Sequence, residues 1–508
     1  MYRRYMHNIL HAENLDTEIL NAELKFSVKN ADEHVAENID KVVPTYRHSY
    51  HVMPPVGWMN DPNGFNFAFG KYHMFFQFNP YSAEWGPMHW GHFTTSDFVK
   101  WDFQPTALAP DKKYDADGCF SGTSIVKDGK FYLMYTAVAN DLQTQALAVS
   151  DDGIHFEKKG VVISGDKLPD DCSKNDFRDP KVFMRNGVYY AMTGSAGTDG
   201  AGQILLFTSP DLTEWSYVGK VWKDNRTDGI YECPSFTTIG DKDVLITSPQ
   251  KLKKDGWRHE NLHGNIYMVG KLDLDTGEFK SEYEDEIDGG FDFYAAQTLS
   301  APDGRTIMAA WMQMWARSMP TEKDGWAGSA ILPRELTLRG NKLYQAPVRE
   351  IERYRQNKVE IKDKHIHGEV NFDGVNGVKC ELVFTMDIGN SLRSGVKLFR
   401  GNENETSVYY DREKDLVVFD RSKMGITISH DKKEDDAAFR YVRASKNGGK
   451  ISFRIFLDVS SAEVFINDGE RVMTGNVYSK KEDTGISFFA EGGDARLINL
   501  EKYDIVVC

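Results

Sequence analysis

Hydrophobic residues change their spacing once along the chain, near position 44. Between residues 13 and 43 they recur every three to five positions, and Glu, Asp and Lys fill the other face. This is the period of an amphipathic helix, and Pro44 would end it because proline lacks the amide hydrogen that a helix needs. We therefore expect a helical N-terminal extension over residues 1–45, packed on the outside of the main domain. Its apolar positions are Leu15, Ile19, Leu24, Val28, Ala31, Val35 and Ile39.

After Pro44 the pattern changes to short aromatic and apolar runs separated by turn residues, and one unit recurs. A glycine opens such a run at positions 70, 129, 187, 240 and 304, at intervals of 59, 58, 53 and 64 residues. A second repeated pattern, a serine and an aspartate followed by an aromatic residue, occurs at 96–101, 150–156 and 209–215. Five units of 50–65 residues, each with room for four short strands, predict a five-bladed β-propeller over residues 46–346. A β-sandwich could hold as many strands but would not explain the recurrence.

The repeat stops at Pro347, where a different region begins. The charged segment 348–355 predicts a linker helix within residues 347–360. Residues 361–508 then return to strand-like runs: 451–457 alternates with period two, and 462–466 leads into the hairpin sequence Asn467-Asp468-Gly469. We expect a C-terminal β-sandwich here, so that the fold class is all-β.

Composition and charge narrow the class of protein. The 508 residues include 61 Lys and Arg against 76 Asp and Glu, a net charge of −15, which argues against nucleic-acid or anionic-membrane partners. No run approaches the roughly 18 apolar residues of a membrane span, and the N-terminus has no signal-peptide core. Five scattered cysteines fit free thiols in a reducing compartment. We therefore expect a cytoplasmic protein.

Three acidic residues precede repeated glycines at nearly equal distances. Asp61, Asp179 and Glu232 stand nine, eight and eight residues before the glycines of the first, third and fourth units. Because the innermost strand of each blade lines the central channel, this register would direct three carboxylates at one axis. Taken alone, each segment could be structural only; those of Asp61 and Asp179 have the composition of a turn, since Asp-Pro commonly starts one. Three like charges brought together are costly unless chemistry uses them, which favours a functional site.

These segments resemble the motifs of glycoside hydrolase family 32, the β-fructofuranosidase or invertase family. Residues 58–64 (WMNDPNG) resemble its nucleophile motif, 177–180 (FRDP) its Arg-Asp-Pro motif and 232–234 (ECP) its acid/base motif. Segments 77–80, 85–86, 120–122 and 292–295 also fit, and segments 332–336 and 458–465 resemble the end of the propeller and the C-terminal sandwich. The resemblance covers about residues 46–505 and leaves the N-terminal extension outside.

The resemblance implies hydrolysis with retention of configuration at the fructosyl carbon, which uses two carboxyl groups. Asp61 would be the nucleophile, Glu232 the acid/base and Asp179 the acid that stabilises the transition state. Glu232 should have a pKa raised by burial and by its acidic neighbours, whereas donors from its own turn should keep Asp61 ionised. Arg178 would tune Asp179 or contact the sugar.

Further residues, most of them in these motifs, would form the walls of a sugar pocket. Hydrogen-bonding groups would come from Asn60, Gln77 and Ser121, and flat apolar surfaces from Trp58, Trp85, Phe120, Tyr294 and Trp311. For Trp58 and Trp311, packing in the propeller core is equally compatible with the sequence. His89 and His92 have strand-like surroundings and no evident third ligand, so we expect neither a metal nor a cofactor.

The partner is expected to be a small sugar, with sucrose and short fructo-oligosaccharides as substrates. Sucrose 6-phosphate is the alternative, and it would need a cationic contact such as Arg258, His259, Arg317 or Lys323. Segment 313–323 resembles the family least, so it could set leaving-group specificity. The sequence also leaves open an inverting pentose glycosidase and a non-catalytic sugar-binding propeller, although the latter would be expected to have lost an acid. Transfer of fructose to another sugar and the oligomeric state stay open.

Overall fold

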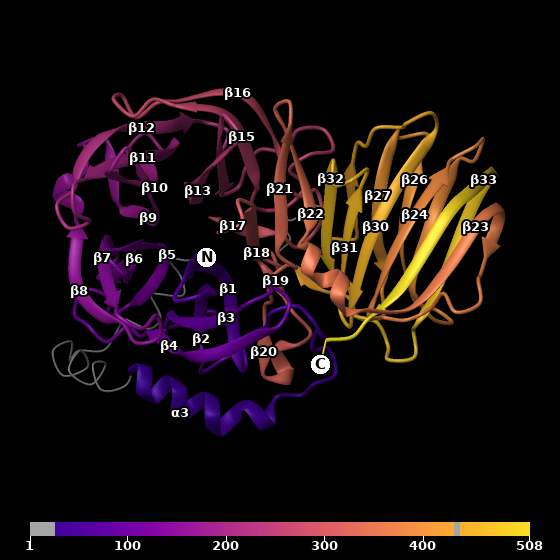
Figure 1. The fold of residues 1–508 in the computed structure, drawn as a ribbon, viewed down its shortest axis with the longest axis horizontal. Helices are drawn as coiled ribbons and strands as arrows, with labels where there is room; N and C mark the ends of the chain where they lie inside the picture. Colours follow the sequence, from indigo (N-terminus) through magenta and orange to yellow (C-terminus); the bar gives the residue numbers. More distant parts are fainter. Residues whose placement is uncertain (1–25, 431–436, 508) are drawn as a thin grey trace.

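A ring of five β-sheets is followed in the chain by a second β-rich unit (Figure 1). The computed structural model describes residues 26–430 and 437–507. The ring confirms the predicted all-β class and the five-bladed propeller. Strands β1, β5, β9, β13 and β17 are the innermost strands of the five blades, and each contacts the innermost strands of the neighbouring blades.

Each blade is an antiparallel sheet whose strands follow one another outward from the channel. The first contains β1 (Gly57–Ala68), β2 (Lys71–Asn79), β3 (His89–Thr95) and β4 (Trp101–Leu108), with β20 (Trp326–Ala327) parallel to β1. The second contains β5 (Gly118–Lys127), β6 (Lys130–Ala139), β7 (Leu142–Ser150) and β8 (Glu157–Ile163). The third contains β9 (Cys172–Arg185), β10 (Val188–Gly197), β11 (Gly202–Ser209) and β12 (Ser216–Asp224). The fourth contains β13 (Tyr231–Ile239), β14 (Lys242–Pro249), β15 (Ile266–Leu272) and β16 (Phe279–Glu286). The fifth contains β17 (Tyr294–Ser300), β18 (Thr306–Trp311), β21 (Arg334–Arg339) and β22 (Lys342–Pro347).

The repeated glycines mark the turn between the first two strands of every blade. At all five positions φ lies between 63° and 86°, and a Cβ atom would meet nothing within 4 Å. The backbone conformation, not a lack of space, therefore favours glycine there. In the first three blades the residue before the glycine also has a positive φ, as in the type I′ turns that join tightly paired strands.

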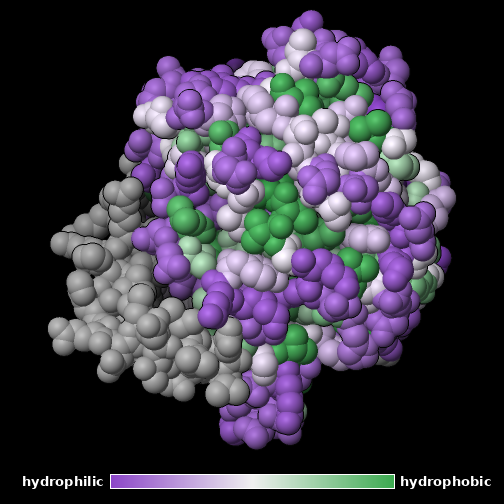
Figure 2. All heavy atoms as spheres, turned by 90° about the vertical axis from the view of Figure 1, so that its left-hand side faces the viewer, coloured by the Kyte–Doolittle hydropathy of each residue, from purple (hydrophilic) through white to green (hydrophobic). Residues whose placement is uncertain are grey.

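Apolar side chains fill the space between neighbouring blades. Met134 and Leu147 of the second blade lie in one buried cluster with Phe177 and Phe207 of the third. Similar clusters join the third blade to the fourth and the fourth to the fifth. Each large side chain buried in this way contributes about 1.5–3 kcal/mol. On the side that carries β8 and β12 the surface is largely hydrophilic, with small hydrophobic groups between (Figure 2).

Helix α3 (Val28–Asn38) covers part of the predicted N-terminal helix and continues into a short 3-10 turn, η1 (Ile39–Lys41). Ser27 caps it by accepting a hydrogen bond from the amide of Asn30 at 3.1 Å. Ala31 and Val35 are buried, and the Asp32 carboxylate accepts from the amide of Thr106 in β4 at 2.9 Å. The helix thus packs on the outside of the first blade, whereas predicted positions 13–25 lie outside the described residues. No helix among the described residues is long and apolar enough to cross a membrane.

The linker after Pro347 contains a helix that is shorter than the one expected over 347–360 and is of the 3-10 type. The chain forms only a short 3-10 segment, η4 (Arg349–Tyr354), and enters strand β23 (Arg355–Val370) directly. Arg355 binds both carboxylate oxygens of Glu381 at 2.6 and 2.7 Å, and β23 pairs with the last strand of the chain. The pairing with a distant strand outweighs the local helical preference of the charged residues.

The C-terminal region forms the β-sandwich-like unit that the sequence predicts. Its last strand, β33 (Gly485–Ile505), pairs with β25 (Arg393–Arg400) through its first half and with β24 (Cys380–Asp387) through its second half. This one strand therefore connects the strands on the β25 side of the sheet with those on the β24 side. The predicted hairpin connects β31 to β32, with φ values of 49°, 58° and 82° at residues 467–469. The strands are β24 (Cys380–Asp387), β25 (Arg393–Arg400), β26 (Glu405–Asp411), β27 (Leu416–Lys423), β29 (Phe439–Val442), β30 (Lys450–Asp458), β31 (Ser461–Ile466) and β32 (Arg471–Asn476).

A buried ionic network joins the propeller to this C-terminal unit. The guanidinium of Arg334 in β21 lies 2.9 Å from Asp288 and 2.6 Å from Glu463 of β31, and all three side chains are fully buried. His51 lies between Glu463 and Asp458, at 2.8 and 2.9 Å. Burial disfavours a charged imidazole, but the two carboxylates outweigh it and raise the pKa of His51 to about 9. The sequence segments around 332–336 and 458–465 therefore meet at this interface.

Replacing Arg334 by methionine should lower the free energy of unfolding by about 3–5 kcal/mol, because Asp288 would lose a buried cationic partner and Glu463 would keep only His51. Denaturation by urea, followed by tryptophan fluorescence, measures this. Arg339→Met is the matched control. Arg339 lies in the same strand, but its contacts are near the surface: an exposed ion pair with Asp468 at 3.7 Å and the half-buried ring of Tyr344 at 4.1 Å. Equal and small effects of the two substitutions would contradict the stabilising role of the network.

Candidate active site

The innermost strand of every blade is interrupted by a β-bulge. The breaks in register lie at Asn60–Asp61 in β1, Ser121 in β5, Asp179–Pro180 in β9, Cys233–Pro234 in β13 and Ala295–Ala296 in β17. A bulge frees amide groups from the sheet and redirects side chains, and it tolerates the prolines that lie in or directly after three of these breaks. The three acids lie in or directly beside the bulges, which turn their side chains toward the channel.

The bulges also bring strained backbone to the site. Asp179, Cys233 and Ala295 have positive φ values of 61°, 49° and 56°, which are uncommon for residues other than glycine. Such conformations cost of order 1–3 kcal/mol each and persist where the surrounding structure imposes them. The residue before each of them, Arg178, Glu232 or Tyr294, therefore occupies an equivalent position in its blade. Glu232 is thus aligned with Arg178 rather than with Asp179.

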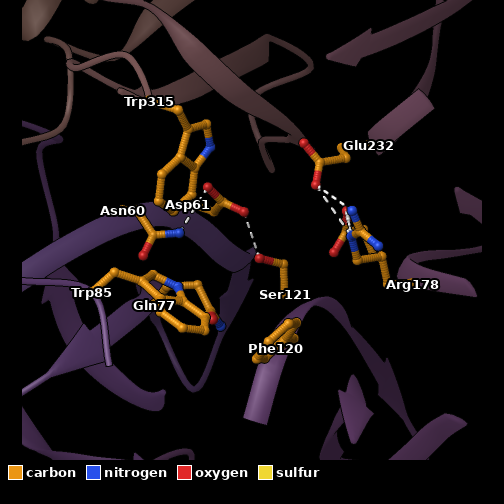
Figure 3. Close-up of a pocket in the computed structure, with 10 residues that line it drawn as sticks. Asn60, Asp61, Gln77, Trp85, Phe120, Ser121, Arg178, Glu232 and Trp315 are labelled. Carbon is orange, nitrogen blue, oxygen red and sulfur yellow. Dashed lines mark hydrogen bonds and ion pairs between the residues drawn. The ribbon is translucent and has the colours of Figure 1, made fainter. Parts of the chain in front are cut away.

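A pocket at the end of the channel collects most of the predicted site residues (Figure 3). It is open to solvent and has about 340 Å³ of free space. Asp61 and Glu232 face each other across it, and Ser121 lies beside Asp61. Its lining residues are Asn60, Asp61, Gln77, Trp85, Phe120, Ser121, Arg178, Asp179, Glu232 and Trp315. Carboxylates, amides and flat aromatic surfaces in one small pocket suit a polyhydroxylated ligand.

Asp61 is held by side chains from two blades. The hydroxyl of Ser121 donates to Asp61 Oδ2 at 2.6 Å, and the amide of Asn60 donates to Oδ1 at 3.0 Å. Asn60 is oriented in turn by the indole N–H of Trp58, 2.7 Å from its carbonyl oxygen. Asn60 comes from the same segment as Asp61, where the sequence suggested a donor, whereas Ser121 comes from the second blade.

Asp179 and Asp61 share a neighbour in Cys233. The backbone amide of Cys233 donates to Asp179 Oδ2 at 3.0 Å, and its thiol lies 3.4 Å from Asp61 Oδ2 and 3.6 Å from Asp179 Oδ2. Burial and both carboxylates raise the pKa of this thiol well above its usual value. Cys233 therefore stays protonated and can donate to either acid.

Glu232 is bound on both carboxylate oxygens. Arg178 donates to Oε1 through Nη2 at 2.7 Å and Nε at 3.1 Å, and the hydroxyl of Tyr294 donates to Oε2 at 2.6 Å. The guanidinium lies farther from Asp179, at 4.0 Å. Arg178 thus pairs mainly with Glu232, although the sequence suggested Asp179 or the sugar.

The three acids differ in how strongly they hold a proton. Burial raises the pKa of Asp61, although Ser121 and Asn60 oppose the rise. Burial, together with the charges of the other two acids, raises the pKa of Asp179 to about 7 despite Arg178. Burial alone would also raise the pKa of Glu232, but Arg178, the nearby His263 and the Tyr294 hydroxyl outweigh this effect and lower the pKa. The expectation of a raised pKa for Glu232 is therefore wrong for the free pocket.

Three predicted aromatic residues lie behind the pocket wall instead of lining it. Trp58, Tyr294 and Trp311 are buried, and the Trp58 and Trp311 rings meet at a centroid distance of 5.7 Å. Trp315, which the sequence analysis did not select, lines the pocket and stacks on Trp58 at 6.0 Å. It lies in segment 313–323, the part with least family resemblance, so only its aromatic character could have pointed to it.

The cationic residues considered for a phosphate contact do not line this pocket. Arg317 is buried and binds Asp292 at 2.7 Å, while Arg258 pairs with Asp255 and Asp285. His259 is buried beside Glu286, and Lys323 lies in the short 3-10 segment η3 (Glu322–Asp324). Among the described residues that line the pocket, Arg178 is the only basic one.

One group in the described part of the chain could place three ligand atoms around a metal ion: His48, His51 and Asp458. It lies at the interface with the C-terminal unit, not in the pocket. Both ring nitrogens of His51 already bind carboxylates, and His48 Nε2 lies 2.8 Å from the hydroxyl of Ser460. The arrangement is that of a hydrogen-bonded network.

Comparison with known proteins places the chain among sugar hydrolases. The N-terminal domain of glycosyl hydrolases family 32 matches residues 51–347, and the C-terminal domain of that family matches residues 350–504. A sucrose-6-phosphate hydrolase of Zymomonas mobilis is 37% identical over 90% of this chain and 91% of its own. A raffinose invertase of Escherichia coli is 36% identical over 89% of this chain and 94% of its own. A variant of the β-fructofuranosidase of Bombyx mori, solved in complex with sucrose, is 32% identical with a TM-score of 0.80, covering 94% of this chain and 98% of that one.

Proposed function

Because the chain is a β-fructofuranosidase-type enzyme of glycoside hydrolase family 32, we propose that it releases terminal β-D-fructofuranosyl units from sucrose and short fructo-oligosaccharides with retention of configuration. The observation that carries this proposal is the pair Asp61 and Glu232, which face each other across one small pocket. Asp179 lines the same pocket. Two carboxyl groups on opposite sides of the scissile bond are what a retaining glycosidase requires. We also propose a cytoplasmic location, where imported small sugars would be the substrates.

In the first step, Asp61 attacks the anomeric carbon of the fructosyl unit. The bond from this carbon to the glycosidic oxygen breaks, and the leaving oxygen takes a proton from Glu232. Ser121 and Asn60 hold Asp61 in a fixed orientation for the attack. The product of this step is a fructosyl ester of Asp61 together with the free leaving sugar.

In the second step, water attacks the same carbon from the face that the leaving group vacated. Glu232, now ionised, takes the proton of the water, and the ester bond to Asp61 breaks. Asp179 would accept hydrogen bonds from fructose hydroxyls and stabilise the positive charge that develops on the sugar ring. Two inversions at one carbon give overall retention.

Glu232 must carry a proton in the first step, although in the free pocket Arg178 and Tyr294 favour its ionised form. A bound sugar excludes water, and this penalises charge in the pocket. We propose that one proton is shared between the acids, held near neutral pH by Asp179 in the free pocket and by Glu232 when substrate is bound.

Replacing Tyr294 by phenylalanine should raise the pKa of Glu232, because it removes a donor to the ionised carboxylate at 2.6 Å. Since Glu232 must be protonated in the first step, the alkaline limb of the kcat/KM profile should move to higher pH by about 0.5–1 unit. A pH series from 5 to 9 with sucrose measures the shift. Tyr283→Phe, which removes a hydroxyl bound to Asp285 outside the pocket, should leave the profile unchanged. An alkaline limb that stays at the wild-type pH in both variants would contradict the effect of Tyr294 on the pKa of Glu232.

A second candidate is the hydrolysis of sucrose 6-phosphate, which the name of the Zymomonas mobilis relative favours. The lining of the pocket favours an uncharged substrate, because its three carboxylates face a single arginine that Glu232 already binds. The two candidates are compared by kcat/KM for fructose release from sucrose and from sucrose 6-phosphate, side by side. We expect plain sucrose to be used at least as well as the phosphate ester. A strong preference for the ester would establish the second candidate, and no release from either would contradict the proposed function.

A further inference from the structure

One aromatic wall of the pocket, the indole of Trp315, lies on an irregular segment of the chain. The segment, residues 312–316, connects β18 to β19 (Arg317–Ser318). Trp315 lines the pocket (Figure 3) and is half-buried, with its ring stacked on Trp58 at 6.0 Å. The next residue, Ala316, has a φ of 64°, which is uncommon for residues other than glycine and persists where the surrounding structure imposes it. The position of this wall therefore depends on contacts from outside the segment.

The C-terminal unit binds the chain on both sides of Trp315. Before it, the side-chain amide of Asn476, at the end of β32, donates to the backbone carbonyl of Met312 at 2.9 Å. After it, β19 pairs in antiparallel fashion with β28 (Ser429–His430), a short strand of the C-terminal unit. In Figure 1, β19 lies where the propeller meets this unit. Two attachments thus enclose the residue that forms the wall.

A shared carboxylate adds a third attachment. Arg317, two residues after Trp315, lies 2.7 Å from one oxygen of Asp292, and Arg421 of β27 lies 2.8 Å from the other. All three side chains are fully buried, and the backbone amide of Asn476 also donates to Asp292, at 2.8 Å. Hydrogen bonds and ion pairs are strong in such a dry environment and hold one geometry. Asp292 therefore connects an arginine of the C-terminal unit to the segment that carries Trp315.

The two ionic networks of this interface differ in what they reach. The network of Arg334 also joins the propeller to the C-terminal unit, but its partners Asp288 and Glu463 lie outside residues 312–318. The network of Arg421 ends at the chain beside Trp315. The first can stabilise the fold alone, whereas the second also fixes a wall of the pocket.

We propose that the C-terminal unit holds Trp315 in place, with Arg421 and Asn476 as positioning residues, and in this way contributes to the binding of the sugar substrate. This inference rests on the proposed function and deepens it. Neither residue lines the pocket, so each acts through Trp315. An aromatic wall contacts the sugar before and during the reaction, so its displacement weakens substrate binding more than it slows the chemical step.

The test separates KM from kcat. Arg421→Met should raise KM for sucrose about fivefold while kcat changes less than about twofold. Asn476→Ala removes only the bond to Met312 and should raise KM about threefold, and it carries the test if Arg421→Met does not fold. Partial unfolding alone would lower the apparent kcat and leave KM unchanged. Arg334→Met is the matched control, because Arg334 is an equally buried arginine of the same interface and should change KM less than twofold.

A double variant tests whether the effect passes through Trp315. Trp315→Leu should raise KM about tenfold, since it removes the aromatic surface from the pocket. In that background Arg421→Met, or Asn476→Ala in its place, should raise KM by less than about 1.5-fold further. Residues that act through one another show such non-additive effects, whereas independent effects multiply.

Three results would overturn the inference. The first is a KM in Arg421→Met and Asn476→Ala no higher than in Arg334→Met. The second is an unchanged KM in Trp315→Leu. The third is a double variant whose increase in KM equals the product of the two single increases. Failure of the proposed function is distinguishable, because the wild type would then release fructose from neither sucrose nor sucrose 6-phosphate, and the inference would fall with it.

Discussion

Replacing Asp61 by asparagine should lower kcat for sucrose by about 10⁴-fold or more, because the amide cannot form the fructosyl ester on which both steps depend. The substitution keeps the size of the side chain, and its partners Ser121 and Asn60 can still bond with an amide. Initial rates of glucose and fructose release over a range of sucrose concentrations measure the effect.

The control for this variant is Asp243→Asn. Asp243 is also a buried carboxylate of the propeller, but it pairs with Arg185 and does not line the pocket. We expect this variant to lose some stability and to keep most of its activity. Near-normal turnover in Asp61→Asn, with an unchanged unfolding transition, would show that Asp61 is not the nucleophile.

Replacing Glu232 by glutamine should have the second-largest effect, a fall in kcat of about 10²–10⁴-fold with sucrose. Glutamine cannot donate a proton to the leaving oxygen, and it leaves Arg178 without its anionic partner in the buried pocket. An aryl fructoside with an acidic leaving phenol needs no proton in the first step. In Glu232→Gln, formation of the fructosyl-enzyme from this substrate, followed as the rapid release of phenol, should therefore be much less impaired than its formation from sucrose.

The comparison between the two substrates separates a chemical role from a structural one. A Glu232→Gln enzyme that loses the first step equally with sucrose and with the aryl fructoside would contradict the acid role. Glu350→Gln serves as the control, since Glu350 is a buried carboxylate that pairs with Arg305 away from the pocket. This variant should leave the ratio of the first-step rates with sucrose and with the aryl fructoside unchanged.

The propeller could be predicted from the sequence because its repeat has a local cause. The first hairpin of each blade has a glycine with positive φ at its turn, and this feature is repeated in all five blades. The linker could not be predicted in the same way. The charged residues after Pro347 suit a helix locally, but Arg355 and the residues after it pair with β33, which lies over a hundred residues away in the chain.

The three acids of the site could also be found from the sequence, because the bulges of the inner strands occur at similar distances from the glycines. The sequence did not reveal which residues contact one another across blades. The contacts of Arg178 and Tyr294 with Glu232 depend on the shape of the bulges, and they reverse the expected direction of its pKa. Trp315 belongs to a segment without a motif, so its place in the pocket depends on the fold alone.

The central claim is that fructose is transferred through a covalent ester with Asp61, and the configuration of a transfer product tests it most directly. Sucrose is incubated with the wild-type enzyme in buffer that contains methanol, and the methyl fructofuranoside formed is examined by NMR spectroscopy. Two successive inversions predict the β-anomer, the configuration of the fructosyl unit in sucrose. Formation of the α-anomer would indicate a single displacement and would contradict the assignment of Asp61 as the nucleophile.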